Sequence, residues 1–143
     1  LGLLTVGYYG HRDLLTDARL GRRELTYINT SEDIPSQLPK PSDLGIAVKH
    51  SIDGGIARYE AVLNQMGVGA LPCFTVAHDN NIIRLPNTLS VPYFHVWLLY
   101  HKDLRQSARV RALFTHLSSL DHPFIKCKFA HLVIEHGAFY LKE

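Results

Sequence analysis

The sequence is poor in the features that mark secreted and membrane proteins. Among its 143 residues are only two cysteines, Cys73 and Cys127, which form neither a disulfide framework nor the paired spacing of a zinc site. No apolar run reaches the ~20 residues of a membrane-spanning helix, and no signal peptide is visible. We therefore expect a cytoplasmic protein with free thiols and no membrane contact.

A strong excess of one charge is also missing. The 15 Lys and Arg residues are nearly balanced by 13 Asp and Glu, and the formal net charge of +2 gives no general attraction to nucleic acid. What remains is typical of one globular domain. Hydrophobic residues make up 46% and charged residues 20%, and the chain is long enough to bury a core.

Hydrophobic patterning predicts alternating strands and helices. The expected strands are 3–9, 24–29, 44–50, 68–74, 81–86, 93–101, 131–136 and 138–142. The expected helices are 11–20, one within 51–67, and 104–120, and a proline-containing loop is expected at 30–43. Because strand, helix and strand follow one another over 44–74, this stretch predicts a βαβ unit. The fold class is therefore α/β in three layers, with a mostly parallel sheet that carries one antiparallel strand.

The helix within 51–67 has a periodic apolar face. Four residues at helical spacing are expected to pack on the sheet: Ile56, Tyr59, Leu63 and Met66. Ser51 or Asp53 can cap its N-terminus, and Gly67 suits a left-handed position at its C-terminus.

The stretch 97–114, WLLYHKDLRQSARVRALF, raises the possibility of a basic DNA-reading helix. Five residues of the 104–120 helix form a complete apolar stripe, however: Val110, Leu113, Phe114, Leu117 and Leu120. Asp103 can cap this helix, and Arg105 and Arg109 share another face. A recognition helix follows another helix, whereas a strand is expected here, so we predict a packing helix and no direct DNA binding by this chain alone.

Three segments resemble LysR-type transcriptional regulators. The stretch 97–114 is similar to their W-L-L-Y-H-P-D-L-R-R-S-A-R-V-R-A-F signature, with Lys102 in place of the usual proline and Gln106 in place of arginine. Residues 60–74, EAVLNQMGVGALPCF, resemble the family's A-G-x-G-I-A-x-L-P segment, and residues 7–15 weakly resemble its Y-A-S-P-x-Y-L stretch. The three segments come in the family's order over roughly residues 3–120.

This resemblance implies one lobe of a type 2 periplasmic-binding-protein-like effector domain over 1–120, with the 104–120 helix returning to the first lobe. The residues 121–143 do not resemble the family's ending, and we expect them to form an atypical extension that packs on the same domain. In the family, a small effector binds between two lobes and changes oligomer geometry on DNA. We expect the DNA-binding domain and the first lobe to be absent from this chain, which then has at most half of the cleft.

The candidate effector-binding residues are Ser51, Asp53, Gly54, Tyr9 and His11. The first three lie at a helix N-terminus, where free N–H groups can bind an anion, although Asp53 would repel one. Helix capping, and core packing of Tyr9, are the structural alternatives.

The expected function is non-catalytic effector sensing with no cofactor, and the apolar stripe of the 104–120 helix predicts a homo-oligomer interface. A protein-interaction module that senses no ligand, and a small α/β enzyme that uses Cys73 or a histidine, are the alternatives. The pairs His95/His101 and His116/His122 lack the short spacing of metal ligands, so no metal site is expected.

Overall fold

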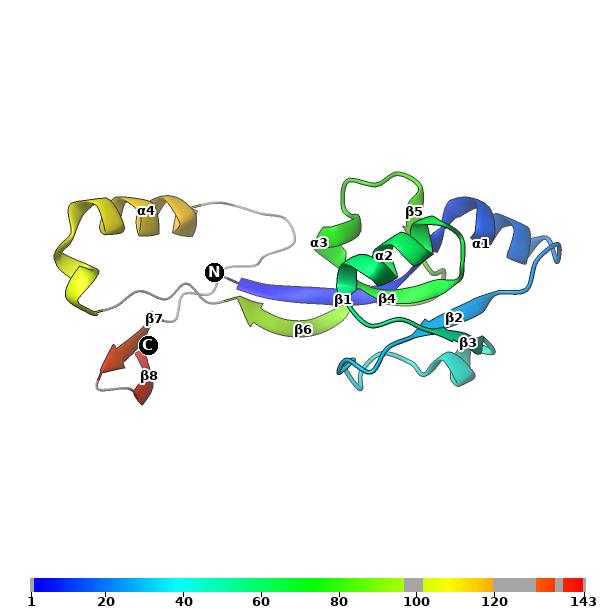
Figure 1. Cartoon of the computed structure of the whole chain (residues 1–143), viewed down its shortest axis with the longest axis horizontal. Helices are drawn as coiled ribbons and strands as arrows, with labels where there is room; N and C mark the ends of the chain where they lie inside the picture. Colours follow the sequence, from blue (N-terminus) through cyan, green and yellow to red (C-terminus); the bar gives the residue numbers. More distant parts are fainter. Residues whose placement is uncertain (1, 97–101, 120–130, 136–137, 143) are drawn as a thin grey trace. The chain divides into compact units, whose positions relative to one another are not determined.

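The computed structural model describes residues 2–96, 102–119, 131–135 and 138–142. The chain divides into two compact units, Thr5–Tyr93 and a second one formed by residues 1–4 and 94–143. Figure 1 shows the helices and strands along the chain. They are β1 (Gly2–His11), α1 (Arg12–Arg19), β2 (Thr26–Asn29), η1 (Pro41–Leu44), β3 (Ala47–Ser51), α2 (Gly55–Leu63), β4 (Val68–Pro72), α3 (Cys73–Val76), β5 (Ile82–Arg84), β6 (Val91–Val96), η2 (Lys102–Gln106), α4 (Ala108–Ser119), β7 (His131–Glu135) and β8 (Ala138–Lys142).

The main sheet follows the order β3-β2-β4-β1-β5, and β6 also pairs with β1. The strands β3 and β4 both run parallel to β2, whereas β1 is antiparallel to β4 and to β5. In this path β1 is thus the one strand that runs against the others. The predicted α/β class, with a mostly parallel sheet and an antiparallel strand, is confirmed. The crossover from β3 through α2 to β4 is the predicted βαβ unit.

Several predicted boundaries are wrong, and the strand predicted for 44–50 begins only at Ala47. Cys73 and Phe74 belong to the short helix α3 and not to the preceding strand, which ends at Pro72. The helix predicted for 104–120 begins only at Ala108, and Asp103 lies in the 3-10 helix η2 before it. Asp103 is therefore too far upstream to cap α4. The predicted C-terminal strands are present as the antiparallel hairpin β7–β8.

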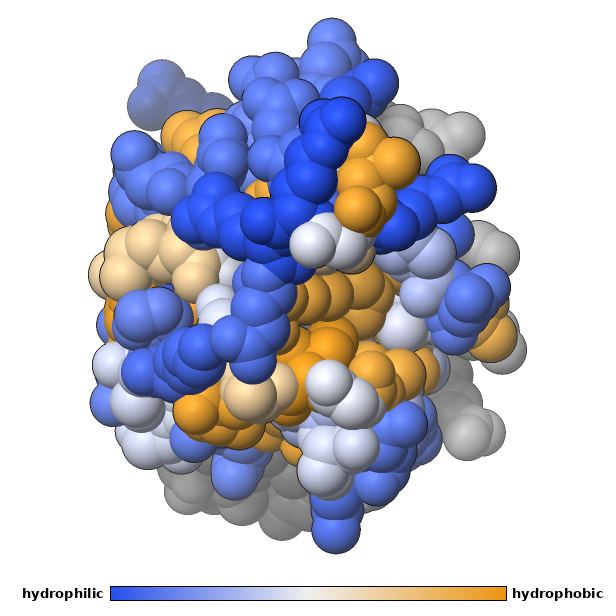
Figure 2. All heavy atoms as spheres, turned by 90° about the vertical axis from the view of Figure 1, so that its right-hand side faces the viewer, coloured by the Kyte–Doolittle hydropathy of each residue, from blue (hydrophilic) through white to orange (hydrophobic). Residues whose placement is uncertain are grey.

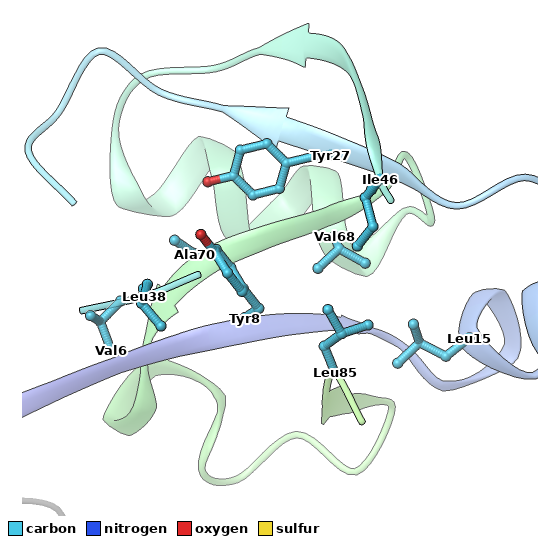
Figure 3. Packing of buried hydrophobic residues seen from close by; sticks show 9 residues of the cluster. All are labelled: Val6, Tyr8, Leu15, Tyr27, Leu38, Ile46, Val68, Ala70 and Leu85. Carbon is cyan, nitrogen blue, oxygen red and sulfur yellow. The ribbon is translucent and has the colours of Figure 1, made fainter. Parts of the chain in front are cut away.

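The main core of the first unit lies on one face of the sheet (Figure 3). Val6 and Tyr8 of β1 alternate with residues that point to the opposite face, as the pleat of a strand requires. The Tyr8 and Tyr27 rings meet edge to face, with centroids 5.6 Å apart. Leu38 and Ile46 from the segment between β2 and β3 cover this face, and the Tyr8 hydroxyl donates a hydrogen bond to the Pro39 carbonyl at 2.7 Å. The proline-containing loop is thus part of the core.

Helix α2 covers the other face of the sheet, but only Tyr59 and Leu63 of the four predicted residues are partly buried. Its buried side chains are Arg58, Ala61 and Val62. Of the predicted apolar face, Ile56 is 82% exposed and Met66 is 41% exposed. The helix is therefore rotated relative to the pattern, because an arginine takes a place on its buried side.

The end of α2 also differs from the prediction. The left-handed residue is Gln65, with a φ of 61°, and not Gly67. Gly67 is required for another reason: a Cβ atom there would lie 2.6 Å from the Thr26 carbonyl oxygen. The glycine allows the start of β4 to approach β2 closely.

Within the described ranges, none of the helices combines the length and the apolar character that crossing a membrane requires.

Candidate functional site

The carboxyl ends of three neighbouring parallel strands, β3, β2 and β4, meet at one edge of the sheet. The residues that follow β2 are Thr30, Ser31 and Glu32, and those that follow β3 are Ile52, Asp53 and Gly54. Ligands of open α/β sheets bind outside this edge. Helix α2 also begins here, so the backbone N–H groups of its first turn, which lack intrahelical acceptors, point toward the same edge.

Arg58 anchors this edge from inside the protein. The residue is only 5% exposed, and its side chain extends from α2 over β4. Its Nε donates a hydrogen bond to the Ala70 carbonyl at 2.8 Å, and Nη1 donates to the Ile52 carbonyl at 3.4 Å. The remaining nitrogen, Nη2, donates to Oε2 of Glu32 at 2.9 Å. A buried arginine in this arrangement presents one charged N–H group to whatever anion lies at the edge.

Glu32 fills the anion position at the start of α2. Its Oε2 accepts from Arg58, and its Oε1 accepts from the backbone N–H of Gly54 at 3.0 Å. The hydrogen bond from Arg58, followed by that from Gly54, lowers the pKa of the Glu32 carboxyl group below its ordinary value. The carboxylate is partly open to solvent, with 39% of its side chain exposed. A carboxylate from the loop therefore occupies the place predicted for an anionic ligand.

Asp53 and Ser51 do not cap α2, because Gly54 is the N-cap residue and no side chain accepts a capping hydrogen bond. Asp53 turns instead toward the residues after β2. Its Oδ1 accepts from the Ser31 N–H at 2.7 Å and from Thr30 Oγ1 at 3.0 Å. These hydrogen bonds, the one from the Ser31 backbone first, lower the pKa of the Asp53 carboxyl group. Asp53 thereby holds the start of the loop that carries Glu32.

Space for a ligand is available outside the helix start. A Cβ atom added at Gly54 or Gly55 would meet no atom within 4 Å. Beneath Glu32 lies a cavity of about 10 Å³, with Arg58, Ala70 and Tyr93 among its lining residues. This volume suits about one water molecule. With Glu32 bound to Arg58, the space on the inner side of Glu32 in the described residues is this small cavity. The outer side, at Gly54 and Gly55, is open to solvent.

The structure does not bring Tyr9 and His11 to this edge. Tyr9 lies on β1 opposite Gly69, whereas Ser51 lies on β3 opposite Asn29. The two strands are three positions apart in the sheet, which is about 14 Å. Tyr9 is buried, and its hydroxyl group donates a hydrogen bond to Cys73 Sγ at 3.1 Å. The His11 side chain caps α1 by accepting from the Asp13 N–H at 3.1 Å.

Three residues at the edge were not predicted from the sequence, namely Arg58, Glu32 and Thr30. The positions of Glu32 and Thr30 directly after β2 were a usable signal, since residues that follow neighbouring parallel strands share one edge. For Arg58 no such signal exists, because arginine is usually a solvent-facing residue of a helix.

Other chemistry finds little support in the described part of the chain. Cys73 is buried, and its sulfur accepts the hydrogen bond from Tyr9. In the described ranges no three His, Cys, Asp or Glu side chains are grouped as metal ligands would be. Of the two histidine pairs considered above, His101 and His122 lie outside the described residues.

The fold and this edge define a lobe of the kind found in periplasmic-binding-protein-like effector domains. The sequence model of the LysR substrate binding domain matches residues 33–120, more than half of the chain, and the chain belongs to this family. The resemblance proposed from residues 60–74 and 97–114 is thus confirmed, while residues 7–15 lie before the matched region. No curated protein and no solved structure matches the chain. The family is one of effector-sensing regulatory domains, which do not catalyse reactions.

Proposed function

We propose that this chain senses a small carboxylate or similar anion as part of a LysR-type transcriptional regulator. The observation that carries the proposal is the Glu32 carboxylate, which bridges Arg58 and the backbone N–H group of Gly54, the N-cap residue of α2. This arrangement already binds a carboxylate, so it has the donors that an effector with the same group needs. An effector enters by replacing Glu32 and taking its two hydrogen bonds.

Replacement of Glu32 also supplies a signal. The loop that carries Glu32 is attached at both ends by hydrogen bonds. The Ser31 N–H group donates to Asp53, and the Tyr8 hydroxyl group donates to the Pro39 carbonyl. Release of Glu32 frees only the segment between these attachments. A local change at the edge of the sheet is therefore coupled to the arrangement of one loop, which differs between the free and the bound protein.

Replacing Glu32 with Ala is expected to lower the melting temperature and to create a site for added acetate. The loss leaves Arg58 without its carboxylate, and because Glu32 is partly exposed we expect a cost of about 1 kcal/mol, or roughly 3 °C. Thermal unfolding in acetate and in chloride at equal ionic strength measures the effect. Acetate at millimolar concentration should recover part of the loss in E32A and should leave the wild-type protein unchanged.

Asp33→Ala provides the matched control, because Asp33 lies in the same loop and forms no hydrogen bond or ion pair with the residues that the structure describes. It removes the same charge but should show no response specific to acetate. Equal acetate responses in E32A, D33A and the wild-type protein would contradict the proposal.

We propose in addition that α4 mediates self-association. Leu113 of its apolar stripe is 57% exposed, and Val110, Phe114 and Leu117 are only partly buried. Leu120, the last residue of the predicted stripe, lies outside the described residues. An apolar stripe of this kind gains free energy when a second copy covers it.

Sedimentation at micromolar concentration should therefore show a dimer in equilibrium with the 16.1 kDa monomer. Leu113→Glu places a charge on the stripe and should shift the equilibrium to the monomer. Ala112→Glu, which adds the same charge at the exposed neighbouring position, should leave it unchanged. A wild-type protein that remains monomeric as its concentration rises would rule out the dimer.

A further inference from the structure

A second pocket lies far from the edge described above, at the other end of the same unit. Its volume is about 610 Å³, and its lining includes Leu15 and Ala18 of α1, Leu25 before β2, and Leu85 after β5. Small-molecule sites in proteins commonly measure about 300–1,000 Å³. Figure 2 shows this end of the unit, where an orange apolar area lies in a hollow between blue hydrophilic side chains.

The floor of this pocket is the end of the hydrophobic core. Leu15 and Leu85 belong to the core cluster, and Leu25 packs against it. Figure 3 shows Leu15 and Leu85 together at one end of the cluster. An apolar group of a ligand placed here would extend the core. Burial of its apolar surface away from water would therefore favour binding.

The charged side chains that line the pocket in the described part of the chain are positive. They belong to Arg19 and Arg23, and no acidic residue is among the described lining residues. The nearest acidic residues along the chain are engaged elsewhere, since Asp17 pairs with Arg22 and Glu24 pairs with Lys49.

The two arginines differ in their contacts. Arg23 is held in place, because its Nη1 donates to Gln65 Oε1 at 3.1 Å and its Nη2 donates to the Gln65 carbonyl at 2.9 Å. The side chain of Arg19, the last residue of α1, forms no hydrogen bond or ion pair with any residue that the structure describes. Its guanidinium group therefore has all its donors available to an anion.

The end of α1 does not compete for these donors. Three carbonyl groups of its last turn are already bound, since the N–H groups of Leu20, Arg22 and Gly21 donate to the carbonyls of residues 16, 17 and 18. These three carbonyl groups are therefore not available as acceptors for the guanidinium group of Arg19.

We propose that this pocket binds a small organic acid with an apolar body, such as a medium-chain or aryl carboxylate. The apolar part lies on Leu15, Leu25 and Leu85, and the carboxylate pairs with Arg19 at the rim. This site is independent of the edge at Glu32 and Arg58, so the chain has one site for a carboxylate group and a second that also requires an apolar group.

Calorimetry of the whole chain with octanoate tests the proposal. Acetate has the charge without the apolar body, and 1-octanol has the body without the charge. We expect octanoate to bind and each of the two controls to bind at least about tenfold more weakly, because 1-octanol lacks the charge-assisted hydrogen bond and acetate lacks the apolar contact. Equal affinity for octanoate and 1-octanol would overturn the proposal, because the arginine would then contribute nothing.

Two surface variants separate the pocket from the rest of the molecule. Arg19→Gln should weaken octanoate binding about tenfold, as expected for a charged partner. Arg12→Gln removes an equal charge from an exposed position at the other end of α1, outside the pocket lining, and should leave the affinity unchanged. Equal affinity in R19Q and the wild-type protein would overturn the proposal.

The E32A variant distinguishes this site from the one at α2. If octanoate bound in place of Glu32, then E32A would bind octanoate more tightly, as we expect it to do for acetate. That result would refute the site at the α1 pocket and leave the proposed site at Glu32 and Arg58 standing. An unchanged octanoate affinity in E32A, together with the loss in R19Q, supports the pocket at α1 whatever the outcome for acetate.

Discussion

Replacing Arg58 with Ala is expected to destabilise the protein by about 3 kcal/mol. The change removes a buried side chain and leaves a cavity against β4, and it takes the donors away from the Ala70 and Ile52 carbonyls. It also removes the partner of Glu32, although that carboxylate can reach solvent and adds little to the cost. Urea unfolding measures the loss as a lower midpoint at an unchanged m value.

Arg12→Ala serves as the matched control for Arg58. Arg12 is an exposed arginine whose Nη2 donates one hydrogen bond to the Asn80 carbonyl at 2.8 Å. Its removal should cost at most about 0.5 kcal/mol, as for surface substitutions in general. Losses of similar size in the two variants would show that Arg58 is not the internal anchor of this edge.

Replacing Gly67 with Ala is expected to cost about 2–3 kcal/mol. The added methyl group would lie 2.6 Å from the Thr26 carbonyl oxygen and 2.9 Å from Thr26 Oγ1. Because the first of these atoms belongs to the backbone of β2, relief requires that β2 and β4 separate, and overpacking of this kind costs about 1–3 kcal/mol. The Thr26 hydroxyl, which donates to the Met66 carbonyl at 2.9 Å, would be displaced as well.

Gly55→Ala, within the same βαβ unit, is expected to stabilise the protein, in contrast to Gly67→Ala. Gly55 is the first residue of α2, its φ is negative, and a Cβ there meets no atom. Alanine restricts the unfolded chain and favours the helix, so a gain of up to about 0.5–1 kcal/mol is expected. Chemical unfolding of both variants should place them on opposite sides of the wild-type protein. A neutral G67A would show that the strands tolerate separation.

The order of helices and strands was predictable from local patterns, but the orientation of α2 was not. Apolar periodicity assigned Ile56 to the buried side, whereas Arg58 occupies that side because three acceptors meet it there. Two of those acceptors are backbone carbonyls, whose positions no residue type in the sequence indicates. The third is the carboxylate of Glu32, 26 positions earlier in the chain. A pattern that treats arginine as polar and exposed cannot anticipate such a site.

The candidate site was predictable only in its location. A helix that starts after a parallel strand predicts free N–H groups near Ser51–Gly54, and the structure places the start of α2 there. The competing carboxylate of Glu32 comes from a loop whose composition predicts only that it is irregular. Likewise, Asp103 suggested a capped helix, but the local chain forms the 3-10 helix η2, and α4 begins after Ser107.

Under the proposed function, the hydrogen bonds of Glu32 limit how fast this chain can respond to an effector. A site that contains its own competitor is ready for ligand only during the fraction of time in which the competitor is away, and the apparent affinity falls by that fraction. If the bridge from Glu32 to Arg58 and Gly54 must open first, the observed association rate reaches a plateau at high effector concentration, set by the opening of the loop. Such a sensor would respond little to an anion that is present only briefly or at low concentration. A substitution of Glu32 would change the effector concentration that is needed for a response without changing the effector's own contacts.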